Sequence, residues 1–420
     1  MLDIKFIRQN PDKVKEACQK KQVKVDIDLL LDIDKKRRET LQALEDMRSQ
    51  KNKSSDEIAK LKNEKERRKI ILKMQELDRN SDRLNKDLKG QEKEFENLML
   101  QIPNLPYDDV PTGRDDRDNV VLREVGERPK FNFQSKDYLE LAEKMDLIDT
   151  KRAAKTSGSR FSFLKNEAAF LELSLINFTF EKLIKEGFVP VIPPVMLREE
   201  MARGTGYFET VDREEAYFIP ADKLFLVGTS EQSLITMHSD ETFKEKDLPK
   251  RYLGFSTCFR REAGSYGKDT KGILRVHQFD KIEMFSFCRP EESRKEHQFF
   301  LEMEESLMQA VKIPYQVVQI CTGDLGRPAA SKFDIEAWLP SENRYRETHS
   351  TSNCTDFQAR RLNIRYQDKS GKLNFVHTVN GTAFAIGRTL IAIIENYQQK
   401  DGSIKVPEVL QKYLKFNVIK

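Results

Sequence analysis

The chain has 420 residues, of which 73 are Lys or Arg and 69 are Asp or Glu, so its formal net charge is only +4. No apolar run approaches the roughly 20 residues that a membrane-spanning helix needs, and the first residues lack the apolar core of a secretion signal. Five cysteines stand without CxxC spacing, so we expect neither a disulfide framework nor a zinc site. These features favour a cytoplasmic protein of two or three domains with no membrane partner.

Residues 27–100 differ from the rest of the chain. Of these 74 residues 36 are charged, and the segment contains one glycine, one aromatic residue and no proline, which is typical of long helices. In its second half mostly apolar residues recur at alternating spacings of three and four positions, as in the a/d seam of a coiled coil. The seam positions are Met74, Leu77, Ser81, Leu84, Leu88, Gln91, Phe95 and Leu98. Polar residues, Arg48, Lys51 and Ser55, stand at the matching positions of the first half.

Two arrangements are open for this segment. One continuous helix would be about 110 Å long and would need a partner chain. A hairpin that reverses near residues 63–66 would instead bring Leu41 and Leu44 opposite Leu84 and Leu88. Because apolar layers then match in both halves, we predict an antiparallel two-helix coiled-coil arm.

The predicted end of this arm is basic. Residues 60–73 contain seven basic and two acidic side chains. An ordinary solvated helix surface is one explanation, and a surface that binds the phosphate backbone of RNA by its shape is another. The candidate RNA contacts are Lys62, Lys65, Arg67, Arg68 and Lys69.

Prolines at positions 103, 106 and 111 end the helical composition. We therefore predict an N-terminal domain over residues 1–103, a linker over 104–135, and a second domain over 136–420. From residue 187 onward strands and turns alternate with helices, which favours an α+β fold.

The strongest chemical signal is CFRREAG (258–264) followed by RVHQFDKIEMFSF (275–287). Residues 252–259 and 278–287, which overlap these motifs, alternate like paired strands, and this places Phe279, Lys281 and Glu283 on one sheet face. Burying such charges together is costly unless they are used. An internal lattice of ion pairs is the alternative, but the aromatic residue among the charges favours a ligand site.

Three short motifs resemble those of class II aminoacyl-tRNA synthetases. Gly187-Phe188 with Pro194 resembles motif 1, Arg260-Arg261-Glu262 after Phe259 resembles motif 2, and Gly387-Arg388-Thr389-Leu390 resembles motif 3. The two-helix arm, TSE (229–231), FDIEAW (333–338), YRETHSTSNCTDFQARR (345–361) and VNGTAFAIGRTL (379–390) are similar to features of the seryl-tRNA synthetase family within that class. The resemblance covers the whole chain.

This resemblance implies a six- or seven-stranded antiparallel sheet flanked by helices, and a homodimer through residues 187–194. It also implies a two-step ligation. L-serine and ATP give seryl-adenylate and pyrophosphate, and the seryl group then passes to the 3′ end of tRNA(Ser) with release of AMP. Where a cell has tRNA(Sec), that tRNA is a second acceptor.

The resemblance further implies the ATP site. Arg260 would touch the serine carboxylate and the α-phosphate, while Arg275 and Arg388 would hold the outer phosphates. Glu347 and Ser350 supply oxygens that suit Mg²⁺. The implied ATP-binding set is Arg260, Arg261, Glu262, Arg275, Phe279, Glu347, Thr348, His349, Ser350 and Arg388, with Arg260 and Arg388 as catalytic residues. Phe279 would stack on adenine, Glu262 would accept from its amino group, and His349 has a packing role as its alternative.

The implied serine site comprises Thr229, Ser230, Glu231, Arg260, Glu283, Asn380 and Thr382. Two carboxylates suit a substrate with an ammonium and a hydroxyl group, and we assign Glu231 to the former and Glu283 to the latter. A site that hydrogen-bonds a hydroxyl can reject a substrate without one by about 10⁴-fold. Thr382 stands where many family members have serine, which keeps the hydroxyl and adds a methyl group.

Two other functions remain to be weighed. A coiled-coil scaffold would explain residues 27–100 and nothing else. A non-catalytic relative would have lost charged residues of the site, and this chain has all of them. Serine-dependent exchange of pyrophosphate into ATP separates an active enzyme from such a relative.

Overall fold

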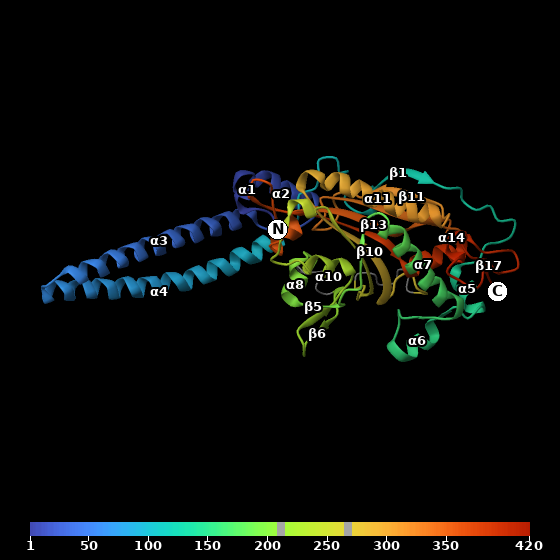
Figure 1. The fold of residues 1–420 in the computed structure, drawn as a ribbon, viewed down its shortest axis with the longest axis horizontal. Helices are drawn as coiled ribbons and strands as arrows, with labels where there is room; N and C mark the ends of the chain where they lie inside the picture. The colour runs from blue at the N-terminus through green and yellow to red at the C-terminus, as the bar shows by residue number, and fades with distance from the viewer. Residues whose placement is uncertain (208–214, 264–270) are drawn as a thin grey trace. The chain divides into compact units, whose positions relative to one another are not determined.

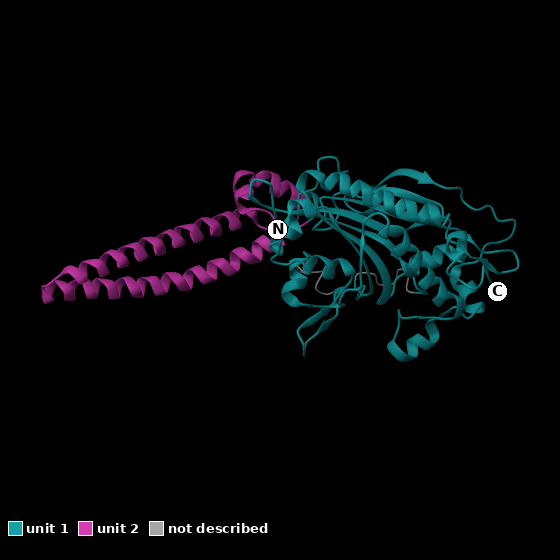
Figure 2. Ribbon diagram, in the orientation of Figure 1, with its two compact units in different colours: residues 1, 20–22, 104–420 teal, residues 2–19, 23–103 magenta. Residues whose placement is uncertain are grey.

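The computed structural model describes residues 1–207, 215–263 and 271–420. These residues form two compact units (Figure 2). One comprises residues 2–19 and 23–103, and the other residue 1, residues 20–22 and residues 104–420. None of the described helices is both long and apolar enough to cross a membrane. Gly264, the last residue of the CFRREAG motif, lies outside the described residues.

The first unit is helical. Its elements are α1 (Ile4–Gln9), α2 (Pro11–Lys20), α3 (Ile27–Lys60) and α4 (Glu64–Gln101). The last two helices lie side by side in opposite directions, so the predicted hairpin is confirmed (Figure 1). The chain reverses over residues 61–63, slightly before the predicted 63–66. The reversal ends at Asn63 because this residue caps α4: its side chain accepts a hydrogen bond of 3.0 Å from the Lys65 amide. The turn therefore needs neither Gly nor Pro.

The seam predicted for α4 is confirmed, because all eight of its residues are half-buried. Two contacts join the helices as antiparallel pairing requires. Lys51 Nζ lies 2.5 Å from Asp78 Oδ1, and the Arg37 guanidinium lies 4.6 Å from the centroid of the Phe95 ring. An exposed ion pair such as Lys51–Asp78 contributes little stability. The two contacts together nevertheless report the register of the helices.

Two of the three positions predicted for the seam in the middle of α3 are wrong by one residue, whereas the third, Lys51, does reach the partner helix. Met47 and Ser54 are half-buried, while Arg48 and Ser55 are exposed. Spacing of three residues after Leu44, rather than four, accounts for the partial burial of Met47. The polar stretch of α3 therefore has one half-buried apolar side chain in its middle.

The second unit is built on an eight-stranded sheet in the order β1-β11-β12-β13-β16-β10-β9-β4. The strands are β1 (Val120–Val125), β11 (Tyr315–Gln319), β12 (Ser331–Leu339), β13 (Arg344–Thr355), β16 (His377–Ala385), β10 (Gln278–Cys288), β9 (Lys250–Phe259) and β4 (Val189–Val191). Neighbouring strands are antiparallel, except that β4 is parallel to β9.

The sheet thus corrects two expectations. It has eight strands, and it is not antiparallel throughout, because β4 adds a parallel edge strand. At the other edge β1, which is rich in valine, pairs with β11 and belongs to the sheet although it lies within the predicted linker 104–135.

Helices and short strands surround the sheet. The helices are α5 (Tyr138–Lys144), α6 (Thr150–Ser157), α7 (Asn166–Ile184), α8 (Glu199–Gly204), α10 (Ser230–Thr236), α11 (Ser293–Ala310), α12 (Phe357–Arg361), α13 (Ile386–Asn396) and α14 (Glu408–Gln411), with 3₁₀ turns at η1 (Asp116–Asp118), η2 (Glu245–Asp247) and η3 (Pro290–Glu292). The short strands are β2 (Ile148–Asp149), β3 (Phe163–Leu164), β5 (Met196–Arg198), β6 (Phe218–Ile219), β7 (Leu224–Leu226), β8 (Thr242–Lys244), β14 (Arg365–Gln367), β15 (Leu373–Phe375), β17 (Ile404–Lys405) and β18 (Val418–Ile419).

The two faces of the sheet differ in chemistry. On one face Ile282 and Met284 of β10 join the large apolar core formed with α7, α11 and α13. The alternation of β10 turns Lys281 and Glu283 to the opposite face, as predicted. There α10 and α12 cover a smaller apolar cluster, and the rest of that face is polar. A polar sheet face beside a packed core is where a ligand site can form.

Candidate active site

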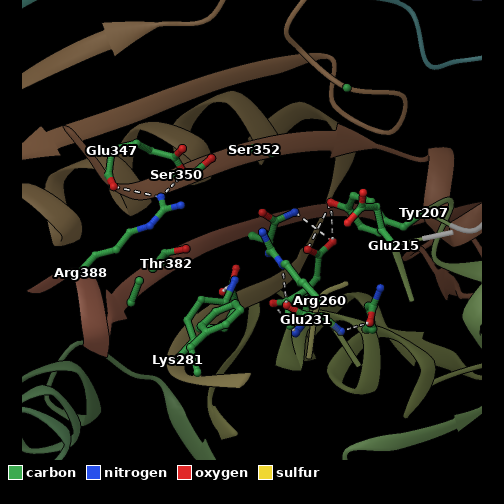
Figure 3. A pocket seen from close by; sticks show the side chains of 18 of the residues that line it. Tyr207, Glu215, Glu231, Arg260, Lys281, Glu347, Ser350, Ser352, Thr382 and Arg388 are labelled. Carbon is green, nitrogen blue, oxygen red and sulfur yellow. Dashed lines mark hydrogen bonds and ion pairs between the residues drawn. The ribbon is translucent and has the colours of Figure 1, made fainter. Parts of the chain in front are cut away.

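A cavity of about 800 Å³ opens on this polar face (Figure 3). Strands β9, β10, β13 and β16 contribute to its lining, together with the first residues of α10 and α13. The predicted site residues that line it are Thr229, Glu231, Arg260, Glu262, Arg275, Phe279, Glu283, Glu347, Thr348, Ser350, Asn380, Thr382 and Arg388. Residues from motif 2, motif 3 and the segments between them therefore converge on one space.

Three predicted residues do not line this cavity. Ser230 is buried, and its hydroxyl donates to the Gly254 carbonyl oxygen at 3.2 Å. Arg261 has an exposed side chain that is not part of the lining. His349 packs its ring 5.3 Å from that of Phe384, and burial lowers the pKa of His349 to about 3. A neutral, buried His349 fits the packing role rather than ATP binding.

A β-bulge shapes the end of the cavity that Glu347, Ser350 and Arg388 line. Along β13, Ile335 of β12 pairs with His349 and Glu336 pairs with Glu347, so Thr348 is the extra residue. In a regular strand Glu347 and Ser350 would face opposite sides, because three positions separate them. The bulge instead turns both into the cavity.

Arg388 lies against Glu347 at this end (Figure 3). Its Nη1 donates to the Glu347 backbone oxygen at 3.0 Å and lies 3.3 Å from the carboxylate Oε1. Partial loss of hydration in the cavity opposes ionisation of Glu347, but the positive charges of Arg388, Lys332 and Arg260 outweigh this effect and lower the pKa to about 2. This carboxylate is therefore ionised at neutral pH, and 47% of its side chain is exposed to the open cavity.

Arg260 lies in the middle of the cavity, directly after β9. Its Nε donates to the Gly228 carbonyl oxygen at 3.2 Å, and its guanidinium lies 5.4 Å from the centroid of the Phe279 ring. Arg275 lies 3.4 Å from Glu262 Oε2. A planar cation above an aromatic ring suits a nucleotide whose base stacks and whose phosphate carries charge.

Two buried carboxylates form the other end of the cavity. Glu231 is in the first turn of α10, which Thr229 caps, and α10 approaches the sheet closely because Gly254 has no side chain: a Cβ there would lie 2.9 Å from Leu234 and 3.0 Å from the Ser230 hydroxyl. Glu283 lies on β10, with Lys281 Nζ 2.5 Å from its Oε2.

Glu231 is held by three side chains. Tyr207 donates its hydroxyl to both carboxylate oxygens at 3.2 and 3.3 Å, Gln358 donates to Oε1 at 2.8 Å, and Asn380 donates to Oε1 at 3.1 Å. Burial and the negative charge of Glu283 raise the pKa of Glu231 to about 7. Two carboxylates thus share a buried site that would be stabilised by a cation.

Tyr207, Lys281 and Gln358 contact this end but were not predicted as site residues. Lys281 alternates with Glu283 along one strand, so its presence was visible in the sequence. Gln358 stands inside the motif 345–361, yet its partner Glu231 is 127 positions away. No local signal in the sequence relates those two residues.

The oxygens of Glu347, Ser350 and Ser352 lie at the same end of the cavity as Arg388. Within the described ranges no group of three or more His, Cys, Asp or Glu side chains is placed to hold a metal ion. One ionised carboxylate with hydroxyl groups nevertheless fits Mg²⁺, which commonly binds through one or two carboxylates together with substrate phosphates. These residues therefore suit a metal that arrives with a nucleotide.

At the end of the helical arm, Lys62, Lys65, Arg67, Arg68 and Lys69 are all exposed. None of these five has a charged partner among the ion pairs of the described residues, and the pair Ile71 and Leu72 beside them is also exposed. The structure leaves this basic surface open to solvent.

Two family models match the chain. The model described as the seryl-tRNA synthetase N-terminal domain matches residues 1–106, and the class II core domain of the synthetases for G, H, P, S and T matches residues 215–397. The first model covers the helical unit and the second covers part of the unit built on the sheet.

Curated relatives match over the full length. The serine–tRNA ligase of Dictyoglomus turgidum is 45% identical over 100% of this chain and 99% of the relative. That of Rubrobacter xylanophilus is 42% identical over the same shares.

Solved structures agree with these relatives. The seryl-tRNA synthetase of Pyrococcus horikoshii complexed with ATP matches with a TM-score of 0.92 and 40% identity, over 100% of this chain and 99% of that one. The cytoplasmic serine–tRNA ligase of Naegleria fowleri in complex with AMP matches with a TM-score of 0.87 and 32% identity, over the same shares.

Proposed function

Because this chain belongs to the seryl-tRNA synthetase family and is a serine–tRNA ligase, we propose that the cavity on its sheet is where L-serine and ATP react. One observation carries this assignment. The cavity has the carboxylates of Glu231 and Glu283 at one end, Arg388 beside Glu347 at the other, and Arg260 between them (Figure 3). That order of charges matches a substrate ammonium at one end and a triphosphate at the other.

The first step brings two anions together. The serine carboxylate oxygen attacks the α-phosphorus, and the bond to the leaving pyrophosphate breaks, which gives seryl-adenylate. Arg260 is in position to neutralise both the carboxylate and the α-phosphate with its planar fork. Catalysis is then mostly positioning and charge neutralisation, and no protein side chain needs to become covalently attached.

Residues on either side of Arg260 hold the two substrates. Glu231 accepts from the serine ammonium and Glu283 from its hydroxyl, with Thr229, Asn380 and Thr382 beside them. Phe279 stacks on adenine, and Glu262 accepts from its amino group. Arg275 and Arg388 hold the outer phosphates, which requires Arg388 to exchange part of its contact with Glu347 for a phosphate.

Mg²⁺ would be held by Glu347 and Ser350 together with phosphate oxygens. Its chemistry there is to neutralise phosphate charge and orient the leaving pyrophosphate. Glu347 is suited to this because it is ionised at neutral pH and faces the open cavity.

The second step uses a tRNA. A hydroxyl of the terminal ribose attacks the seryl carbonyl carbon, AMP leaves, and the hydroxyl proton passes to solvent or to the phosphate of AMP. We assign the body of tRNA(Ser) to the exposed basic end of the arm, because phosphates need cations that are not already paired. Where a cell has tRNA(Sec), the same contacts would apply to it.

The domain of residues 1–103 is then the tRNA-binding part, residues 136–420 form the catalytic part, and the enzyme works in the cytoplasm.

A homodimer through residues 187–194 is supported by exposed apolar side chains at this edge of the sheet. Val189 is 50% and Ile192 82% exposed, and Phe170 and Leu173 of the neighbouring α7 are 58% and 55% exposed. Exposed apolar side chains that form a patch mark protein interfaces. Sedimentation equilibrium of the purified chain measures whether two copies associate, and we expect the mass of a dimer.

The test of the proposal is a pair of assays on the purified chain. Serine-dependent exchange of labelled pyrophosphate into ATP reports the first step, and serylation of a tRNA(Ser) transcript reports the second. A chain that binds ATP but catalyses neither reaction would be a non-catalytic relative, and the proposal would fail.

A further inference from the structure

Gln358 is fully buried behind the anionic end of the cavity and does not line it. It lies on α12, directly after β13. Its amide nitrogen donates to Glu231 Oε1 at 2.8 Å and to the Thr205 carbonyl oxygen at 3.1 Å, and its amide oxygen accepts from the Thr378 hydroxyl at 2.7 Å. Both hydrogens of the amide nitrogen are therefore used.

The orientation of this amide is determined by its partners. The Thr205 carbonyl oxygen can only accept, so the amide nitrogen must face it. A flipped amide would place its oxygen against both that carbonyl and the Glu231 carboxylate, which is repulsive. Thr378, itself fully buried, supplies the donor that the amide oxygen needs.

We infer that Gln358 is a positioning residue for serine binding, which holds the Glu231 carboxylate in the orientation that receives the substrate ammonium. The inference rests on the proposed function of the cavity. Gln358 makes the shortest hydrogen bond to Glu231, and its own position is fixed by two further bonds. Asn380, by contrast, lines the cavity and would itself face the substrate.

The hydroxyl of Tyr207 completes the arrangement, since it reaches both oxygens of Glu231 from another side. Glu231 therefore accepts hydrogen bonds from three parts of the chain: Gln358 of α12, Asn380 of β16, and Tyr207 in the segment after α8. A carboxylate held this way loses little rotamer entropy when the ammonium binds, which favours affinity.

The test is Gln358→Met, which keeps the side-chain length and removes the donor. A hydrogen bond to a charged group contributes enough that its loss should raise the KM for serine by about 10-fold or more. The KM for ATP and the kcat of pyrophosphate exchange should change by no more than about twofold to threefold, because the phosphate end is untouched.

Gln398 offers a matched control. It is also buried and fully bonded, with its amide nitrogen donating to the Glu395 and Lys136 carbonyl oxygens at 2.9 and 3.0 Å and its amide oxygen accepting from the Lys136 amide at 2.8 Å. It does not line the cavity. Gln398→Met should lower the Tm as Gln358→Met does, and leave the KM for serine unchanged.

A second pair of variants avoids the loss of Gln358 itself. Thr378→Val removes the donor that orients the amide, whereas Thr378→Ser keeps it. We expect a raised KM for serine in the valine variant and recovery of the wild-type value in the serine variant. Circular dichroism establishes that each variant is folded.

An unchanged KM for serine in folded Gln358→Met, or an equal rise in the KM for ATP, would overturn the inference. If valine and serine at position 378 behave alike, the orienting role fails as well. Failure of the proposed function is a separate outcome, since then the wild-type chain itself would show no serine-dependent exchange.

Discussion

Glu347 and Ser350 face the same side of β13 although three positions separate them, because the bulge at Thr348 adds one residue between them. Sequence spacing alone would turn one of the two side chains away from the cavity. The bulge therefore creates the oxygen cluster that suits Mg²⁺, and it leaves His349 on the core side.

Glu347→Gln should reduce pyrophosphate exchange by about 10²-fold or more, since it removes the ionised oxygen nearest the phosphates. The amide also leaves Arg388 without its carboxylate partner. The rate is measured over a range of Mg²⁺ concentrations, and the requirement for Mg²⁺ should rise. Glu342→Gln is the control, because Glu342 precedes β13 and does not line the cavity; an equal loss in that variant would contradict the role of Glu347.

Arg260→Lys should lower adenylate formation by about 10²-fold, because lysine keeps the charge and loses the fork that reaches two anions. Arg261→Lys provides the matched control, as the neighbouring arginine is exposed outside the cavity. Pre-steady-state formation of seryl-adenylate is the measurement. Near-normal rates in Arg260→Lys would refute the assignment.

Glu283→Gln should raise the KM for serine by about 10-fold or more while the KM for ATP stays nearly constant. The substitution keeps the shape, removes the charge, and leaves the Lys281 ammonium without its partner at 2.5 Å. Initial rates of exchange at varied serine and ATP give both constants. Equal loss of both affinities would mean that Glu283 supports the fold of β10 and does not select the substrate.

The kcat/KM for serine should rise with pH through about 7. Burial and the charge of Glu283 raise the pKa of Glu231 to that value, with Gln358, Lys281 and Tyr207 acting in the opposite direction. Below this pH Glu231 is protonated and cannot pair with the ammonium, so serine binding is lost as the pH falls. The KM for ATP, measured over the same range, should not show this transition; a pH-independent kcat/KM for serine would exclude an essential titration of Glu231 there.

Removing residues 35–95, with a short turn joining Asp34 to Glu96, should leave exchange largely intact and nearly abolish serylation. Serine, ATP and Mg²⁺ are all assigned to the sheet, whereas the tRNA body is assigned to the arm. Both assays on one preparation separate the two steps. Normal serylation without the arm would make it a structural appendage.

A milder change neutralises Lys65, Arg67, Arg68 and Lys69. The salt slope of tRNA binding should fall by about one unit for each phosphate that the arm no longer binds. Neutralising Arg83, Lys86, Lys89 and Lys93, which are exposed farther along α4, makes the same change in charge and should have a smaller effect. If the salt slope of tRNA binding falls equally in the two variants, the effect is one of overall charge, and the assignment of phosphate contacts to the end of the arm fails.

The helices of the arm could be predicted because heptad spacing and the absence of proline are local signals. The hairpin followed from matching the apolar residues of the two halves, and Lys51 with Asp78 confirms the antiparallel register. The reversal at residues 61–63 was predicted slightly too late because an Asn cap takes the place of the usual Gly or Pro. The seam in the middle of α3 was misplaced because a polar stretch carries little periodic signal.

The candidate site divides in the same way. The amino-acid sequence by itself determined which charged residues are available, such as Arg260 and Glu283, and the period of a strand determined that Lys281 and Glu283 share a face. Only the tertiary structure decided that Thr348 bulges, that Arg388 pairs with Glu347, and that Gln358 holds Glu231. The physical reason is that a hydrogen bond depends on distance in space, and the 127 positions between Gln358 and Glu231 contain no local preference that could bring their side chains within 2.8 Å.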